Sequence, residues 1–307
     1  MRRERGAERP GGQGLTKRYR DVVALSECSF QLPAHRIIAL VGANGAGKST
    51  LMSIAAGLLP ATSGEVLAGG QRVDPHRRPR PADTAHRVAI LAQDKPLYRD
   101  FTVADMLKFG QHTNRVWDQR RAVNWLDRFE VPFGRRCGRL SGGQRAQVAL
   151  AVALGGCPDV LLLDEPLANL DPVARSEVTG ELIAEVADSG MTVILSTHIV
   201  AELAGVGEYL LLLLAAGRPV LAGDIEELLA DHVRLTGPRA DLPPCPGQIV
   251  RAQHTERQST FIVRLPSQAV PSAVAPGWSS GPVTLEQLTV TYLKTSEKPP
   301  RVLEAAV

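Results

Sequence analysis

The sequence lacks the features that mark several large classes of protein. Its four cysteines, Cys28, Cys137, Cys157 and Cys245, are widely separated and form no CxxC or CxxH pair. This argues against a zinc site or a disulfide scaffold and fits a reducing compartment. The longest aliphatic run, at 209–216, is far shorter than the roughly 20 residues that cross a bilayer. Any membrane role must therefore come from a partner protein.

The net charge is also small. The formal net charge is only +3 over 307 residues, which argues against a dedicated nucleic-acid binder and against a strongly membrane-attracted surface. The first ten residues, MRRERGAERP, carry an arginine pair, but no apolar stretch follows as a secretory or twin-arginine signal requires. We expect residues 1–14 to form a disordered basic tail.

The composition that remains, 44% hydrophobic and 22% charged, is that of a globular protein with a real core. From Leu15 to about Leu229, aliphatic runs alternate with helix-like segments. The runs are typical of strands buried on both faces of a parallel sheet, and they lie at 37–42, 160–164, 192–197 and 209–214. Helical patterning fits KSTLMSIAAGL, RAQVALAVAL and PVARSEVTGELIAEVADSG, whose final Gly190 can cap its end. This alternation predicts an α/β domain over residues 15–229.

The pattern changes after about residue 230. The segments DLPPCPG and VPSAVAPGWSSGP are rich in proline and glycine, which marks loops and a boundary. QIVRAQ and STFIVRL flank HTERQ and predict a β-hairpin. TLEQLTVTYLK then has helical spacing, with Thr284 and Gln287 as a capping-box pair. We predict a small α+β accessory domain over residues 230–307.

Residues 42–50, GANGAGKST, match the phosphate-loop pattern GxxxxGK[ST] between a strand and a helix. The glycines let backbone N–H groups turn inward around phosphates, and the helix N-terminus adds partial positive charge. Lys48 is expected to reach the β and γ phosphates, and the Ser49 hydroxyl to bind Mg²⁺. The candidate nucleotide-binding residues of this loop are Gly42, Asn44, Gly45, Gly47, Lys48, Ser49 and Thr50.

The run VLLLDEP supplies acidic groups for the same chemistry. An apolar strand delivers Asp164 to its carboxyl end, where it can hold Mg²⁺ through water, and Glu165 can orient or deprotonate an attacking water. An Asp–Glu pair of this kind could instead belong to a salt-bridge network. The phosphate loop favours the catalytic interpretation, because phosphoryl transfer depends mostly on positioning and charge stabilisation.

A third motif, LSGGQ at 140–144, lies between these two, and the three together in this order resemble the ATP-binding cassette (ABC) ATPases. The resemblance covers residues 15–229. It implies a P-loop NTPase core with a helical signature subdomain at about 94–150, an ATP hydrolase activity, and ATP and Mg²⁺ as cofactors.

The resemblance also assigns residues that would carry little weight alone. It implies that Tyr19 stacks on adenine, although a single strand tyrosine is more often packing. It implies that Gln93 contacts Mg²⁺ and nucleotide, that Asp171 bridges two halves of a dimer, and that His198 contacts the γ-phosphate. In the family two ATPase domains dock head to tail, so the signature of one covers ATP held by the other. The expected signature residues are Ser141, Gly142, Gly143 and Gln144, which act in trans.

The helix after the signature departs from the family pattern. The family's RQRVALARAL is RAQVALAVAL here, so Arg145 remains while Gln147 and Val152 replace two arginines. These changes bear on packing or partner contact rather than on catalysis.

The resemblance implies that a multispan membrane permease and a second ATPase subunit, the same chain or a different one, are the partners, with no nucleic acid. The insert after Gln93 is mostly helical in pattern and corresponds to the region that receives the permease. Together they predict a peripheral protein at the cytoplasmic face of the plasma membrane. An exporter of the ABC-2 type is the leading hypothesis, from the resemblance of the carboxyl-terminal segment to such ATPases. An importer and, less favoured, a non-transport ATPase acting on ribosomes or DNA are the alternatives.

Overall fold

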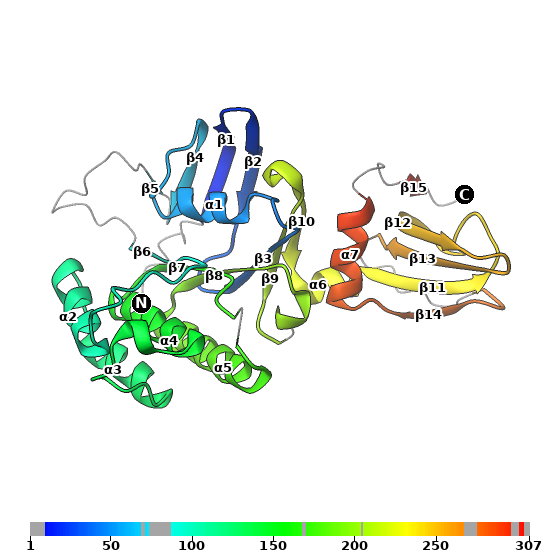
Figure 1. Cartoon of the computed structure of the whole chain (residues 1–307). Helices are drawn as coiled ribbons and strands as arrows, with labels where there is room; N and C mark the ends of the chain where they lie inside the picture. The colour runs from blue at the N-terminus through cyan, green and yellow to red at the C-terminus, as the bar shows by residue number, and fades with distance from the viewer. Residues whose placement is uncertain are drawn as a thin grey trace, which may run out of the picture.

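The computed structural model describes the residues in the ranges 10–68, 71–73, 87–167, 170–203, 205–266, 275–295 and 301–303. These residues form three β-sheets with helices packed around them (Figure 1). Two of the sheets belong to the core domain, the described residues from 10 to 230. The third belongs to the accessory module, the described residues from 232 to 303. None of the helices in the described ranges has the length and apolarity required to span a membrane.

The central sheet of the core domain has the order β10-β9-β3-β8-β7-β6. Its strands are parallel except for β10, which pairs antiparallel with β9. The four aliphatic runs predicted as buried strands are confirmed as β3, β7, β8 and β9. The strands span β3 (Ile37–Gly42), β6 (Val88–Leu91), β7 (Val160–Asp164), β8 (Thr192–Thr197), β9 (Tyr209–Leu213) and β10 (Pro219–Asp224). The short 3₁₀ turn η3 (Ala215–Gly217) joins the last two.

A second, antiparallel sheet has the order β2-β1-β4-β5. Its strands are β1 (Gly11–Tyr19), β2 (Val22–Gln31), β4 (Ser63–Ala68) and β5 (Gln71–Arg72). The predicted boundary of the disordered tail at residue 14 is wrong, because β1 begins at Gly11. Gly11 and Gly12 pair with β2 on one side and β4 on the other, and a Cβ on Gly11 would lie 2.8 Å from the Phe30 carbonyl oxygen. Residues 1–9 of the predicted tail lie outside the described residues.

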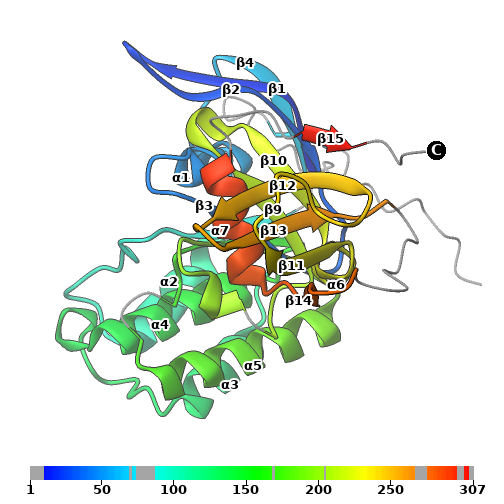
Figure 2. The same cartoon turned by 90° about the vertical axis from the view of Figure 1, so that its right-hand side faces the viewer.

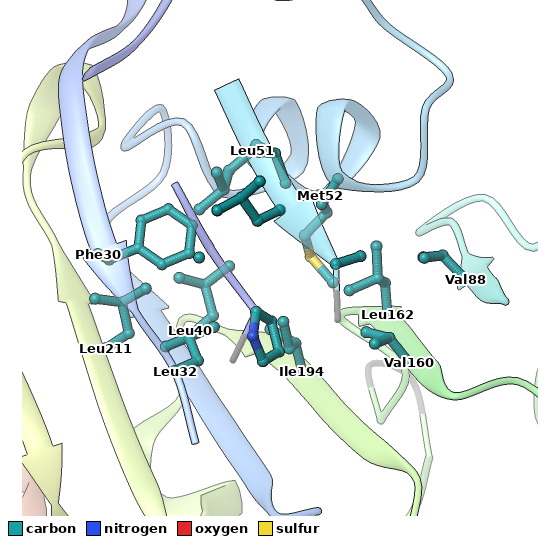
Figure 3. Close-up of a pocket in the computed structure, with 16 residues that line it drawn as sticks. Phe30, Leu32, Leu40, Leu51, Met52, Val88, Val160, Leu162, Ile194 and Leu211 are labelled. Atoms are coloured by element: carbon teal, nitrogen blue, oxygen red, sulfur yellow. The ribbon is translucent and has the colours of Figure 1, made fainter. Parts of the chain in front are cut away.

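Helices cover both faces of the central sheet. α1 (Lys48–Ala55) packs with the antiparallel sheet on one face, whereas α4 (Gly142–Gly155) and α5 (Pro172–Ser189) lie on the other (Figure 1). Gly190 ends α5 in the left-handed conformation, as predicted. The core beneath α1 contains a small cavity of about 30 Å³, lined by apolar side chains such as Phe30, Leu40 and Met52 (Figure 3). A cavity this small and apolar has no polar partners for a water molecule.

The predicted helical insert forms α2 (Val103–Thr113) and α3 (Gln119–Arg128), followed by the 3₁₀ turn η1 (Cys137–Arg139) and α4. α4 extends to Gly155, past the predicted subdomain limit at residue 150. Trp117 lies between Gly110 and Gly155, where a Cβ on either glycine would come within 2.6 Å of its ring. Gln147 is buried and accepts a hydrogen bond from Trp125 Nε1 at 2.8 Å. This departure from the family pattern thus serves the packing of α3 on α4.

The accessory module is a five-stranded antiparallel sheet of order β14-β11-β13-β12-β15 with one helix, α7. The predicted hairpin is confirmed as β12 and β13, and Thr284 and Gln287 exchange the expected capping bonds at 3.2 and 3.3 Å. The elements are β11 (His232–Pro238), β12 (Gly247–His254), β13 (Gln258–Arg264), β14 (Ser279–Pro282), α7 (Leu285–Thr295) and β15 (Arg301–Leu303).

One hydrophobic cluster spans the accessory module and the core domain. α7 lies between the module's sheet and the core domain (Figures 1 and 2), where it contacts α6 (Ile225–Ala230) and the 3₁₀ turn η2 (Val200–Leu203). Leu288 of α7 is fully buried in the same cluster as Leu203 and Leu228. η2 begins two residues after His198, so the module packs against the segment that follows this predicted site residue.

Candidate active site

The phosphate loop connects β3 to α1 in a conformation that only glycine adopts without strain. Gly45 and Gly47 have φ values of 79° and 95°. A Cβ on Gly47 would lie 2.5 Å from the Ala24 carbonyl oxygen, so a side chain there is excluded by space as well as by backbone conformation. Asn44 and Ser49 are exposed and Thr50 is half-buried, which leaves this side of the loop open to a ligand.

Lys48 is folded back onto the loop that precedes it. Its side chain is buried, and Nζ donates to the carbonyl oxygens of Gly42 at 2.7 Å and Ala43 at 3.2 Å. Burial lowers the pKa of Lys48, while the charges of Glu165 and Asp164 oppose that shift. The ammonium group therefore lies within electrostatic reach of the acidic end of β7, as the motif spacing predicts.

Asp164 and Glu165 lie at the carboxyl end of β7. Asp164 is 6% exposed and its Oδ1 accepts a hydrogen bond from the Ser196 hydroxyl at 2.5 Å. Glu165 follows in the left-handed region with φ of 48°, which is uncommon for a residue that carries a Cβ. Strained backbone of this kind concentrates at functional sites.

Gln93 and His198 both reach Glu165. The carboxylate accepts a hydrogen bond from Gln93 Nε2 at 3.1 Å, and its other oxygen lies 2.7 Å from His198 Nδ1. The three residues follow β6, β7 and β8, which are adjacent in the parallel sheet. Parallel strands end at the same edge of a sheet, so these predicted site residues from three distant segments meet at one point.

The signature residues lie at the N-terminus of α4. Ser141 caps α4, where its hydroxyl accepts from Gln144 N–H at 3.1 Å and its own N–H donates to Gln144 Oε1 at 3.3 Å. Gly142 and Gly143 form the first turn of this helix. α4 and α1 lie on opposite faces of the central sheet (Figure 1). The signature is thus built on a different helix and a different face from the phosphate loop of its own chain.

Two further predicted residues, Tyr19 and Asp171, stand apart from the cluster at Glu165. Tyr19 ends β1 in the antiparallel sheet, and its ring is 44% exposed with Lys17 Nζ 5.2 Å from the centroid. Asp171 caps α5, where Oδ1 accepts from the N–H groups of Val173 and Ala174 at 3.0 Å. Within its own chain Asp171 therefore has a structural role as the N-cap of α5, which the Asp-Pro pair at the start of this helix indicates.

The sequence analysis missed one residue of the site, Ser196. It is fully buried on β8, and its hydroxyl contacts both Asp164 and the backbone N–H of Glu165. The signal was a hydroxyl residue near the carboxyl end of the strand that follows the Asp–Glu motif along the chain. Such a residue is recognisable only once the two strands are known to be neighbours.

Comparison with known proteins decides which family builds this site. The family model described as "ABC transporter" matches residues 25–168. The aliphatic sulfonates import ATP-binding protein SsuB of Escherichia coli is 34% identical over 199 residues, which cover 65% of this chain and 74% of that protein. The chain belongs to the ABC transporter family. The energy-coupling factor transporter ATP-binding protein EcfA of Methanoculleus marisnigri is 34% identical over 246 residues, 76% of this chain and 85% of that protein.

Two other ABC proteins are matched over a smaller share of their own length. The chain spans 48% of the length of the xylose/arabinose import ATP-binding protein XacJ of Haloferax volcanii, at 35% identity over 60% of this chain. It spans 59% of the length of the molybdenum import ATP-binding protein ModC of Mycobacterium tuberculosis.

Solved structures support the same fold. An ATP-binding subunit of an ABC transporter superposes with a TM-score of 0.64 at 24% identity, over 72% of this chain and 92% of that one. The dimeric cassette MJ0796 superposes with a TM-score of 0.61 at 23% identity, over 70% of this chain and 98% of that one. At these identities the superpositions show the fold, a P-loop NTPase of the ABC type.

Proposed function

We propose that this ABC protein is the ATP-hydrolysing subunit of a membrane transporter. The observation that carries the proposal is the convergence on Glu165 of Gln93 and His198, with Lys48 of the phosphate loop in electrostatic reach. A carboxylate held at the edge of a parallel sheet beside a phosphate loop suits the activation of water for phosphoryl transfer. A salt-bridge network fits less well, because the phosphate loop beside Glu165 supplies a binding site for the phosphoryl group.

In the proposed reaction, Glu165 accepts a proton from water as the water oxygen forms a bond to the γ-phosphorus. The bond between the γ-phosphorus and the β–γ bridging oxygen breaks, and ADP and phosphate leave. His198 Nδ1, 2.7 Å from Glu165 Oε1, is close enough to orient that carboxylate. The resemblance to the family implies that His198 would also contact the γ-phosphate. Lys48 would exchange the carbonyls of Gly42 and Ala43 for phosphate oxygens when the nucleotide enters the loop.

The donors expected for Mg²⁺ fit that ion. Ser49 offers a hydroxyl, Asp164 a carboxylate and Gln93 an amide oxygen, and Mg²⁺ prefers such hard oxygen ligands alongside phosphate. Bound Mg²⁺ would neutralise charge on the β and γ phosphates. We propose Ser49 and Asp164 as its holders, with Gln93 released from Glu165 to join them.

A second ATPase subunit would complete the site. The position of α4, on the opposite face of the central sheet from α1, supports an arrangement in which Ser141 and Gly143 of one subunit cover nucleotide bound by another. The exposed ring of Tyr19 is available to stack on adenine. We propose a head-to-tail dimer, a homodimer in the simplest case, with Asp171 near its centre.

The proposed membrane partner docks on a groove between α2, α4 and β6. This groove has a volume of about 1090 Å³ and continues from the loop that carries Gln93. Tyr98, Phe101 and Phe109 form an exposed aromatic cluster with ring centroids 4.9–6.4 Å apart, and Val152, in place of the family's arginine, lines the groove. Exposed aromatic groups at a concave surface suit a partner's helix. The chain would then be peripheral at the cytoplasmic face.

Export is the direction that the carboxyl-terminal segment supports, through its resemblance to exporter ATPases of the ABC-2 type. Import is the second candidate, since XacJ, ModC and SsuB are all named import proteins. Each of those matches covers only 60–70% of this chain, so the names of these relatives do not by themselves decide the direction of transport. Transport into inside-out vesicles would mark export, whereas co-purification of a substrate-binding protein with the permease would mark import.

The test of the proposed function is purification of tagged Glu165→Gln protein from detergent-solubilised native membranes in the presence of ATP. The expected result is a multispan protein in near-equal amount, and Mg²⁺-dependent ATP hydrolysis by the purified unmodified chain. Phe109→Glu, which alters the groove but not the phosphate loop, should retain hydrolysis and lose the membrane protein. Recovery of ribosomal or DNA-repair components instead of a membrane protein would refute the transport function.

A further inference from the structure

Ser196 is a fully buried hydroxyl on β8, preceded by three apolar residues and followed by the buried Thr197. Val193, Ile194 and Leu195 precede it on β8 with exposures between 0% and 8%, and Ser196 itself has none. Burying a hydroxyl costs free energy unless its hydrogen and an oxygen lone pair find partners. A serine at this point of the core therefore indicates a specific use for both.

The partners of Ser196 lie on the neighbouring strand. The parallel register of β7 and β8 sets Ser196 beside Asp164. Ser196 Oγ donates to Asp164 Oδ1 at 2.5 Å and accepts from Glu165 N–H at 3.1 Å. The same N–H also donates to the carbonyl oxygen of Ser196 at 3.2 Å. One residue thus contacts both the carboxylate of Asp164 and, twice, the backbone of Glu165.

The contact with Glu165 falls at the strained point of the site. A left-handed conformation in a residue with a Cβ persists only where its surroundings fix it, and Glu165 has φ of 48°. Its amide is held by the two bonds to Ser196. Glu165 contacts Ser196 through its backbone, and Gln93 and His198 through its side chain. The backbone turn at Glu165 therefore sets where its carboxylate lies relative to Gln93 and His198.

We propose that Ser196 is a positioning residue for ATP hydrolysis. Its hydroxyl orients the Asp164 carboxylate, the expected Mg²⁺ donor, and holds the backbone turn that aims Glu165. Ser196 acts through these two residues, since it is fully buried and its hydroxyl is already engaged with both. The inference rests on the proposed function and assigns to it a residue outside the motifs.

The test compares three variants in the full chain. Ser196→Ala removes the hydroxyl, and Ser196→Thr keeps it. Thr192→Val is the matched control, because Thr192 also carries a buried hydroxyl on β8, at the opposite end of the strand, where it accepts from His35 N–H at 2.8 Å. Melting temperatures of all variants are measured beside the kinetics, so that a general loss of stability is recognised.

We expect Ser196→Ala to lower kcat about 10- to 100-fold while the KM for ATP stays within about three-fold, as for a group that is misplaced rather than a lost binding contact. Ser196→Thr should recover kcat to within about three-fold, and Thr192→Val should keep it within about two-fold. The role is refuted if Ser196→Ala keeps kcat within about two-fold, or if Thr192→Val loses as much.

A binding measurement tests the same role without turnover. A fluorescent ATP analogue is titrated in EDTA and in Mg²⁺, and the ratio of the two affinities is compared between the unmodified chain and Ser196→Ala. We expect the affinity in EDTA to be unchanged and the gain from Mg²⁺ to fall by about two- to three-fold, within the change allowed for KM, because Asp164 is no longer oriented. An unchanged gain would overturn the inference. If the unmodified chain hydrolyses no ATP, the proposed function fails, and this ratio still decides whether Ser196 orients Asp164 for Mg²⁺.

Discussion

Replacing Glu165 by Gln should separate ATP binding from hydrolysis. The carboxylate is the proposed general base, and general bases contribute roughly 10²- to 10⁴-fold to turnover. Glutamine has nearly the same shape but cannot accept the proton, so we expect the rate of phosphate release at saturating ATP and Mg²⁺ to fall at least about 100-fold. ATP affinity should change little, since Lys48 and the phosphate loop are untouched.

The structure also limits how much stability this substitution can cost. Glu165 contacts Gln93 at 3.1 Å and His198 at 2.7 Å. A glutamine can still accept from Gln93 through its oxygen and contact the His198 ring through its nitrogen. We therefore expect to lose at most about 1 kcal/mol, the net worth of one hydrogen bond, reduced further because His198 is 43% exposed. For a chain of 307 residues that is at most about 1.5 °C in melting temperature.

Two assays check this prediction together. Phosphate release is measured at saturating ATP and Mg²⁺, and size-exclusion chromatography compares the variant with ATP and with ADP. We expect a dimer with ATP and a monomer with ADP. Glu256→Gln, in the exposed turn between β12 and β13, makes the same chemical change far from the site and should alter neither. Retention of more than about one tenth of the turnover by Glu165→Gln would refute the assignment of the base.

Three other predictions address binding and stability. Lys48→Ala removes an ammonium group whose charged hydrogen bonds are worth about 1.5–3 kcal/mol each. ATP affinity, measured by fluorescence titration, should therefore fall at least about ten-fold. Unchanged ATP hydrolysis by this variant would contradict the assignment of the phosphate site. Leu288→Ala, at a fully buried position shared by both parts of the chain, should cost about 2–5 kcal/mol in urea denaturation; a loss below about 0.5 kcal/mol would contradict the shared core. Burial lowers the pKa of His232, whose ring contacts the Leu228 carbonyl and the Tyr292 hydroxyl and faces the charges of Arg264 and Asp231. The folded state thus favours neutral His232, so stability is complete above the unfolded pKa of about 6.5 and declines as pH falls below it, by at most about 1.4 kcal/mol per pH unit. His232→Asn should flatten this decline in urea denaturation between about pH 7 and pH 5.5, and an equal slope in both proteins would rule out His232 as its source.

Local signals explain which elements the sequence predicts. The aliphatic runs at β3, β7, β8 and β9 are fully or almost fully buried, so their pattern is continuous and typical of central parallel strands. Thr284 with Gln287, and Gly190, are caps that act within a few residues of chain. Such elements depend on their own residues, and their prediction needs no knowledge of distant partners.

The antiparallel sheet was not predicted, because its order depends on distant pairing. β1 pairs with both β2 and β4, and shifts of register interrupt each ladder. Gly11, Gly12 and Gly14 resemble a loop in sequence, yet they form part of β1, in which Gly11 lies close to the Phe30 backbone and Gly12 close to the Phe30 ring. The same limit applies to β11 and β14 of the accessory module, whose pairing joins segments more than 40 residues apart.

The candidate site shows the same division. Motif spacing identified Lys48, Asp164 and Glu165, and parallel strands explain why they meet at one sheet edge. The φ of Glu165 and the role of Ser196 are properties of the β7–β8 register. Neither could be read from residue types, since a serine in a strand has many ordinary explanations.

Because α7 shares a hydrophobic cluster with the core domain, the accessory module is a structural part of the ATPase. A chain shortened after Ala230 would leave Leu203, Val206 and Leu228 without the apolar surface of Leu288 over them. Such a protein would expose an apolar patch that includes η2, the turn that follows His198, and it would tend to aggregate. Anyone who wishes to graft this ATPase onto another permease should therefore exchange residues at the groove of α2 and α4, and transfer the rest of the chain whole.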